Sequence, residues 1–287
     1  MAEDTNGLLT IRVYPGNTLI SPPPELIDGV IAGVADMSFG LVYKPEGFDI
    51  SAVLPFALTA TDSYSALEVY KKIWEQYPDV MGNEWKNVKL VFSGCTVPQW
   101  FFFRDKKVES MADMEGLQIR LPSAELGTMV ELLGGTPAYM SSSDMAAAVE
   151  KGTVQGLTSQ IPAVLAFKME KIKYCLRMKT GSFGVPCPNF VIMNLDTWNS
   201  LDPYYQKVID DSSEWGQKLI SDTWTQAEKD AIAYMEGLGA EFYYLSPEEE
   251  AKWLAIRDGV VEDAMKARDK PGVPATEILQ FIRDNLK

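Results

Sequence analysis

The feature that most constrains this chain is the alternation of short strand-like runs with helical patterns through its first half. Residues 8–14 alternate as a strand and stop at a Pro-Gly pair. A helical pattern follows at 24–33, where Pro24 suits the first turn and Gly33 the C-terminal cap, and a second strand is expected at 34–40. Repeated units of this kind predict an α/β fold with a parallel or mixed sheet.

The alternation continues along the chain. Apolar residues recur at helical spacing over 63–77, and a mostly buried strand is expected at 88–93. Later strands are expected at 117–120, 136–140, 154–159, 187–194 and 240–245, with helices at 126–133 (after a Ser123 cap), 141–152, 161–172, 247–260 and 275–286. Residues 203–237 are helix-rich throughout, and a helix of that length can span two lobes.

Composition excludes several classes of chemistry. The chain contains no histidine, which removes Ser-His and Cys-His nucleophilic devices and the commonest zinc ligand. Phosphate-binding, dinucleotide-binding and calcium-loop motifs are absent from the sequence. The cysteines Cys95, Cys175 and Cys187 are too few and too scattered for a metal site, and they do not fix a disulfide or a compartment. We therefore expect no cofactor and no metal.

The charge balance restricts the partners. With 26 Lys and Arg against 40 Asp and Glu, the net charge is −14, which disfavours nucleic acid and anionic lipid. An anionic ligand would therefore need a local cationic site. No apolar run approaches the roughly 20 residues that cross a bilayer, and the start has no signal-peptide pattern. A soluble two-lobed protein is the expectation.

Residues 111–159 carry motifs that occur together in one known family. They comprise a D-x-x-G-L-x-I-R run at Asp113–Arg120, a helix ending at 133–137, a capped helix at Ser143–Glu150 and a turn at 152–156. This combination resembles the solute receptors of the tripartite ATP-independent periplasmic (TRAP) transporters, a DctP-like family. Further matches at 14–16, 33–37, 54–56 and 194–203 extend the resemblance over nearly the whole chain.

The resemblance implies a two-lobed periplasmic-binding-protein-like fold of type II character, with crossing strands, a long lobe-spanning helix and a ligand cleft between the lobes. It places residues 1–97 and 186–225 in an N-terminal lobe and residues 98–185 and 226–287 in a C-terminal lobe. Family members usually start with a signal peptide, a first strand and most of a first helix that this sequence does not contain. We therefore expect a shortened sequence or a misassigned start, and a first lobe that lacks one strand.

The same resemblance implies which residues bind the ligand. The arginine of the I-R strand clamps the ligand carboxylate in the family, and it corresponds to Arg120, whose planar fork of donors fits both carboxylate oxygens. An asparagine that also reaches the carboxylate corresponds to Ser159, which is shorter and could instead cap the next helix. Ser142 corresponds to a position that is aromatic in some members, and it could equally cap its own helix.

Three further residues are candidates for ligand contact. Trp100 occupies a place where sialic-acid receptors have a second arginine, which argues against sialic acid and favours an aromatic or branched monocarboxylate. The alternative is that Trp100 and the following Phe101–Phe103 are core residues. Asn189 and Phe190 lie on a crossing strand that often adds ligand contacts in the family.

The implied function is an extracytoplasmic, periplasmic receptor that closes around a small organic acid anion and delivers it to TRAP membrane permease subunits. We expect a monomer that catalyses nothing. Two alternatives remain open from the residues: a sensor or binding module without transport, and a cleft enzyme using Asp36, Asp144 or Glu150 as acid–base groups.

Overall fold

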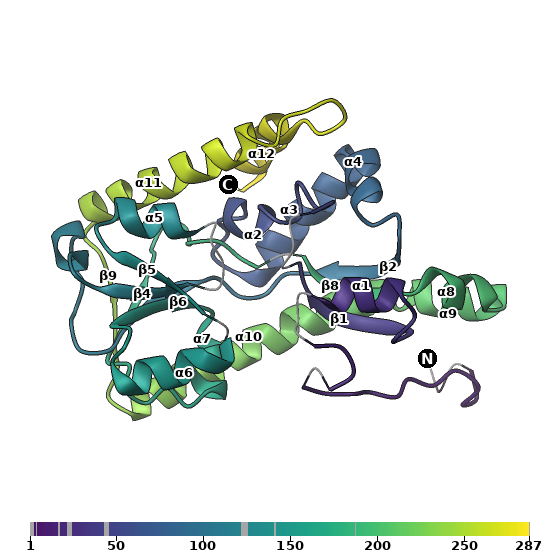
Figure 1. The fold of residues 1–287 in the computed structure, drawn as a ribbon, viewed down its shortest axis with the longest axis horizontal. Coiled ribbons are helices and arrows are strands. Elements are labelled where there is room, and N and C mark those ends of the chain that lie inside the picture. Colours follow the sequence, from purple (N-terminus) through teal and green to yellow (C-terminus); the bar gives the residue numbers. More distant parts are fainter. Residues whose placement is uncertain are drawn as a thin grey trace.

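The structure is a computed structural model that describes residues 3, 5–16, 18–21, 25–42, 46–121, 126–140, 142–186 and 188–286. For Ser142 and Ser143 only the backbone is described. The described strands form a three-stranded sheet and a six-stranded sheet, with helices on both faces of the larger one (Figure 1). The expected two-lobed α/β class is confirmed by the solved structures reported below.

The three-stranded sheet has the order β1 (Met37–Leu41), β8 (Asn189–Met193) and β2 (Lys89–Gly94), and both pairings are antiparallel. The central strand β8 therefore comes from a part of the chain far from its two neighbours. Its side chains Phe190 and Ile192 are fully buried in an apolar cluster that also contains Trp85.

The six-stranded sheet has the order β5 (Thr136–Tyr139), β4 (Gln118–Leu121), β6 (Gly156–Ser159), β3 (Trp100–Phe103), β7 (Tyr174–Arg177) and β9 (Glu241–Tyr244). Strands β5, β4 and β6 are mutually parallel, whereas β3 is antiparallel to both of its neighbours. The carboxyl ends of β4, β5 and β6 consequently lie along one edge, beside the amino end of β3.

Alternating side chains of β3 enter two separate cores. Phe101 and Phe103 are fully buried with α5 (Gly127–Leu132), α11 (Pro247–Lys266) and α12 (Ala275–Asn285) on one face. Phe102 is fully buried on the other face with α6 (Ser142–Lys151), α7 (Ile161–Ala166) and α10 (Ser213–Gly237). Each such side chain contributes about 1.5–3 kcal/mol by leaving water. Core packing therefore accounts for all three phenylalanines.

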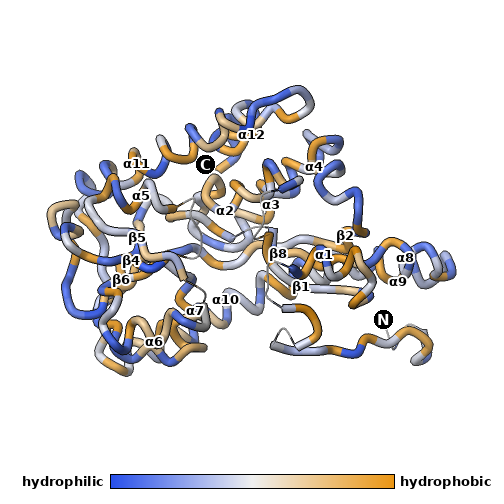
Figure 2. Tube along the Cα trace, in the orientation of Figure 1, coloured by the Kyte–Doolittle hydropathy of each residue, from blue (hydrophilic) through white to orange (hydrophobic). Residues whose placement is uncertain are grey.

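Hydropathy differs between the buried and exposed parts of the chain: β8 is largely hydrophobic, and the connection between α11 and α12 is largely hydrophilic (Figure 2). The remaining helices are α1 (Leu26–Ile31), α2 (Leu54–Ala57), α3 (Ser63–Gln76), α4 (Pro78–Glu84), α8 (Leu195–Ser200) and α9 (Pro203–Asp211).

The long helix α10 joins the two sheets, as expected (Figure 1). Near its start the Ser213 hydroxyl donates to the carbonyl of Val91 in β2, and near its end Ala231 and Met235 are fully buried against the six-stranded sheet. The helix-rich stretch 203–237 is not one helix, because it breaks at Ser212 between α9 and α10.

Two chain segments also cross between the sheets side by side. The backbone N–H of Thr96 donates to Pro186 O at 3.2 Å, and that of Gln99 donates to Gly184 O at 2.9 Å. These bonds continue the β2–β8 ladder toward β3. The sheets are thus connected by two paired strands and one helix, and α2 and α3 also pack against α11 and α12 in one continuous apolar cluster.

Three expectations about elements are corrected. Residues 8–14 form no strand: Leu8 and Val13 are 78% and 74% exposed, and no described strand pairs with them, so the alternating pattern lacks the neighbour that a strand requires. The helix expected at 161–172 ends at Ala166, because Lys168 adopts a positive φ of 51°. Strand β7 lies where no strand was expected. Pro24, Ser123 and Cys187 lie outside the described residues.

Candidate ligand-binding site

Arg120 lies near the carboxyl end of β4, the strand between β5 and β6, and it is only 2% exposed. Its Nε and Nη2 donate to the Met140 carbonyl at 3.2 and 2.9 Å, and its Nη1 is 3.4 Å from the Thr158 carbonyl. Carbonyls that follow the two neighbouring strands therefore fix the guanidinium. A buried positive charge is costly unless an anion faces it, and ligands of α/β sheets bind at the carboxyl ends of strands.

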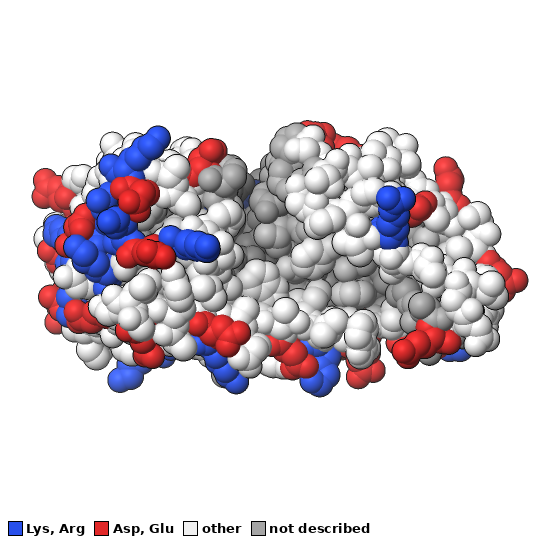
Figure 3. Space-filling view, turned by 90° about the horizontal axis from the view of Figure 1, so that it is seen from below, with Lys and Arg blue, Asp and Glu red and all other residues white. Residues whose placement is uncertain are grey.

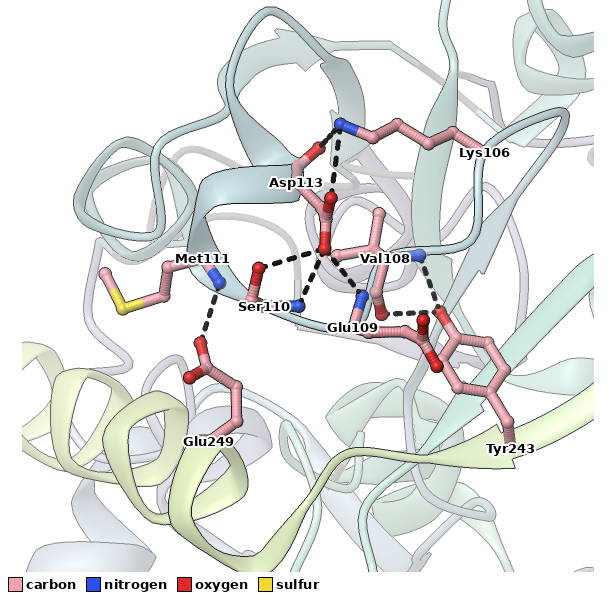
Figure 4. A network of polar contacts seen from close by, with 8 residues as sticks. All are labelled: Lys106, Val108, Glu109, Ser110, Met111, Asp113, Tyr243 and Glu249. Atoms are coloured by element: carbon pink, nitrogen blue, oxygen red, sulfur yellow. Dashed lines mark hydrogen bonds and ion pairs between the residues drawn. The ribbon is translucent and has the colours of Figure 1, made fainter.

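The loop before β4 explains why the D-x-x-G-L-x-I-R motif precedes this arginine. Asp113 accepts hydrogen bonds from the backbone N–H groups of Glu109 and Ser110 and from the Ser110 hydroxyl, at 3.1, 3.0 and 2.9 Å (Figure 4). Gly116 then turns the chain with φ of 77°, which L side chains rarely adopt. Because Ile119 is fully buried and side chains alternate, Arg120 faces the other side of the strand.

Charge and hydrogen bonds hold this loop against the rest of the protein. Burial is the largest influence on Asp113 and raises its pKa, but the bonds from Ser110 and Glu109 and the charge of Lys106 together bring the pKa below its usual value. Glu249 in α11 accepts from Met111 N at 2.7 Å, and the Tyr243 hydroxyl bonds to the backbone of Val108 (Figure 4). Residues of α11 and β9 thus hold the loop that leads into β4 and its Arg120.

Trp100 and Ser159 lie at the same edge of the sheet as Arg120. They are direct partners in the β3–β6 ladder, and Arg120 pairs with Leu157 two residues earlier on β6. Ser159 is 7% exposed. Gln160, not Ser159, is the N-terminal cap residue of α7, and no side chain caps that helix. The capping alternative for Ser159 therefore has no support in the structure.

Trp100 is almost fully buried, and its contact with a ligand stays a prediction. It is 3% exposed and contacts Phe102 and Phe242 at ring-centroid distances of 6.1 and 6.0 Å. The Arg177 guanidinium lies over its ring, 4.3 Å from the centroid. Trp100 thus packs in the core on one side and holds an arginine at the edge of the sheet on the other.

Asn189 and Phe190 begin β8, on the other sheet. Asn189 is 2% exposed, and no described residue bonds to its Oδ1. Phe190 is fully buried and packs against Trp85 at 5.4 Å, so a ligand could reach it only if that core opened. The side chain of Ser142 lies outside the described residues, although its backbone begins α6. The ligand contacts of these residues stay predictions.

Several polar residues at the junction of the sheets were not expected from the sequence. Within the described chain, Gln99 Oε1 and Ser93 Oγ are buried without a hydrogen-bond partner. Gln160 Nε2 is 3.4 Å from the Thr96 hydroxyl, which links the end of β6 to one of the crossing segments. Buried polar atoms normally find partners, so this junction is suited to a polar ligand or water. Single glutamines and serines give no sequence signal of their own.

The carboxylates weighed for an enzyme do not gather at one place. Asp36 accepts from the Thr197 hydroxyl beside α8, whereas Glu150 is an exposed residue near the end of α6, 3.9 Å from Lys171. Among the described residues, no group of three His, Cys, Asp or Glu side chains could hold a metal ion. In the same part of the chain, no helix is both long and apolar enough to cross a membrane.

The surface adds one feature. Seen from below, charged side chains gather over one half of the molecule and along one margin, and the described residues in the middle of this face are largely uncharged (Figure 3).

Comparisons with known proteins agree with this architecture. The family model for bacterial extracellular solute-binding protein, family 7, matches residues 1–267. A monocarboxylate 2-oxoacid-binding periplasmic protein of a Nostoc species is 24% identical over 228 residues, which are 72% of this chain and 57% of that protein. The chain thus spans little more than half the length of that relative. A sialic acid-binding periplasmic protein of Vibrio cholerae is 23% identical over 51% of this chain and 46% of its own.

Solved structures share the fold over almost the whole chain. A marine metagenome TRAP solute-binding protein specific for aromatic acid ligands superposes with a TM-score of 0.89 at 24% identity, over 99% of this chain and 90% of that chain. A TRAP protein of Desulfovibrio salexigens in an open complex has a TM-score of 0.85 at 25% identity, over 99% and 87%. The recognised resemblance is therefore confirmed, and the chain belongs to bacterial extracellular solute-binding protein family 7.

Proposed function

We propose that this protein is an extracytoplasmic solute receptor that binds a small organic carboxylate between its two lobes and delivers it to a TRAP membrane permease. The observation that carries the proposal is Arg120, a buried arginine whose guanidinium is fixed at the carboxyl edge of the six-stranded sheet. Such a group binds a carboxylate through two parallel hydrogen bonds.

The ligand class that fits best is an aromatic or branched monocarboxylate. Solved relatives are described in complex with 3-hydroxybenzoate, with copurified benzoate and with mandelate. Others hold malonate or pyroglutamic acid, so the fold itself does not choose among acids. In this chain the apolar residues at the edge of β3 favour a ring or a branched body over a highly hydroxylated sugar acid.

The lobes that close on the ligand would be residues 1–97 with 186–225, and residues 98–185 with 226–287. This division is supported by the separation into two sheets and by the two paired connections between them. Ligand that contacts both lobes would favour the closed state, and the permease would recognise that state. We further propose a periplasmic monomer that binds its solute without chemical change.

A thermal-shift screen tests the proposal. The purified protein is mixed with aromatic acids, branched acids, 2-oxo acids, dicarboxylates and sugar acids. A ligand at about 100 times its dissociation constant adds about 2.7 kcal/mol to the free energy of unfolding, which gives a clear rise in melting temperature. A rise confined to one class of acids identifies the solute. A folded sample that responds to no carboxylate contradicts the proposed function.

A further inference from the structure

Arg177 lies at the end of β7, and its guanidinium is stacked on the indole of Trp100. The distance from Cζ to the ring centroid is 4.3 Å, and Arg177 is half-buried. The indole itself is fixed, because Phe102 and Phe242 pack against it. Stacking on an aromatic face holds the plane of a guanidinium while its N–H groups stay directed outward. Arg177 is therefore a positioned cation.

The hydrogen-bonding capacity of this cation is not used by the part of the protein that the structure describes. Within that part, no residue accepts a hydrogen bond from Arg177 or forms an ion pair with it. A guanidinium carries five N–H donors, and half-buried donors need acceptors. Water or a bound ligand is suited to supply them.

Glu228 on α10 is a half-buried carboxylate whose charge interacts with that of Arg177. Burial raises the pKa of Glu228, the charge of Arg177 lowers it, and the charge of Asp62 raises it again, with a net rise. Among the described contacts, Arg177 and Glu228 form no ion pair. A hydroxyl can accept from a guanidinium and donate to a carboxylate, so it is suited to bind beside both groups. A second carboxylate would be repelled by Glu228 and Asp62.

Arg177 and Arg120 point from the same face of the sheet at the same edge. In the paired register Arg120 stands beside Leu157, Leu157 beside Phe102, and Phe102 beside Cys175. Arg177 is two residues beyond Cys175, so its side chain is on the same face. The two arginines come from β4 and β7, which are separated by β6 and β3, and the Arg177 guanidinium reaches back over Trp100 on β3.

We propose that Arg177, held over Trp100, is a specificity-determining residue that selects hydroxycarboxylic acids, with the ligand carboxylate on Arg120 and its hydroxyl on Arg177 with Glu228 nearby. The inference rests on the proposed receptor function and narrows its substrate class. It predicts that a monocarboxylate with a hydroxyl binds more tightly than the plain acid and more tightly than the corresponding dicarboxylate.

The test compares dissociation constants by isothermal titration calorimetry within two series of acids. One series is benzoate, 3-hydroxybenzoate and isophthalate, and the other is 3-methylbutanoate, its 3-hydroxy derivative and 3-methylglutarate. The variants are Arg177→Met, Glu228→Gln and a matched control, Arg283→Met, which removes the same charge from α12. Melting temperatures of the free proteins report any effect on folding.

In the tighter-binding series the wild type prefers the hydroxy acid to the plain acid by about tenfold, the value of one charge-assisted hydrogen bond. Arg177→Met reduces this ratio to near one, Glu228→Gln weakens the discrimination against the dicarboxylate, and Arg283→Met changes neither. An unchanged ratio in Arg177→Met, with or without a lower melting temperature, makes Arg177 a structural residue and overturns the inference alone. A wild type that prefers the dicarboxylate also overturns it. A wild type that binds none of the six acids also overturns the inference, whereas the receptor function is contradicted only if the thermal-shift screen finds no carboxylate either.

Discussion

Arg120 is the residue on which the proposed function depends, because it combines burial, a fixed orientation and a position at the carboxyl edge of three parallel strands. Replacing it with alanine removes the charge and both sets of donors. We expect Arg120→Ala to weaken binding of the solute by about 2–5 kcal/mol, the range for loss of one partner of a buried charge pair. Calorimetric titration with the acid found by the thermal-shift screen measures this change.

Arg120→Lys separates charge from geometry in the same experiment. Lysine keeps the positive charge but loses the fork of donors, so we expect affinity between those of the wild type and Arg120→Ala. Arg268→Ala, a change just beyond the end of α11, is the control for a general loss of charge. Wild-type affinity in a folded Arg120→Ala protein would show that the carboxylate binds elsewhere.

The resemblance placed Arg120, Trp100 and Ser159 in one region, and the structure brings these three to the same edge of one sheet. The resemblance gave no indication that Arg177 belongs to this region. That residue reaches Trp100 only because β7 lies beside β3, a pairing between segments far apart in the chain. Local patterns describe single elements, and contacts across a ladder depend on register, which one sequence does not give.

At the scale of elements, α11 holds the chain that leads into the crossing connection. Glu250 accepts from the backbone N–H groups of Lys179 and Thr180 and from the Thr180 hydroxyl, at 2.9, 2.7 and 2.6 Å. Further along α11, the Arg257 guanidinium donates to the Ser182 carbonyl. The segment 179–182 is therefore fixed to the six-stranded lobe just before it reaches Gly184.

This anchor makes stability depend on pH. Burial raises the pKa of Glu250, but the hydrogen bonds from Thr180 and Lys179 outweigh it, so the pKa is lowered overall. A carboxyl with a depressed pKa stabilises the fold above its unfolded value of about 4.3, and that contribution is lost as pH falls through the folded value. Because an amide cannot accept all these bonds, Glu250→Gln should cost about 1–3 kcal/mol at neutral pH.

Thermal unfolding of the wild type and Glu250→Gln from neutral pH to below about pH 4 measures this contribution. The difference in melting temperature should be largest at neutral pH and shrink as the acid limb is reached. Glu236→Gln, an exposed position on α10, is the matched control and should show little difference at any pH. A constant difference for Glu250→Gln across the range would mean that Glu250 contributes by packing alone.

Most elements could be predicted from periodicity, since helices such as α3 and strands such as β2 and β4 occur where the pattern indicates. The failures have physical causes. Residues 8–14 have the alternation of a strand but no described partner for their backbone, and the short β7 is stabilised by β3 and β9 on either side, not by its own pattern.

At the scale of the whole molecule, two sheets are connected by two paired strands and by α10, and α2 and α3 pack against α11 and α12. The family resemblance predicted this arrangement, because its motifs extend along nearly the whole chain. Local sequence patterns do not predict how one sheet is oriented relative to the other. Such orientations change with a ligand that contacts both parts.

Closure should therefore be visible as a change of overall size. A single compact globule of this length has a radius of gyration of about 19 Å, and an open two-lobed molecule exceeds that value. We expect small-angle X-ray scattering to give a smaller radius of gyration for the wild type at saturating solute than for the free protein. The same solute concentration should leave Arg120→Ala at the ligand-free value, because the cation that draws the acid between the lobes is absent. If the solute binds tightly and the radius does not change, the lobes are already closed in the free protein, and recognition by the permease cannot depend on closure.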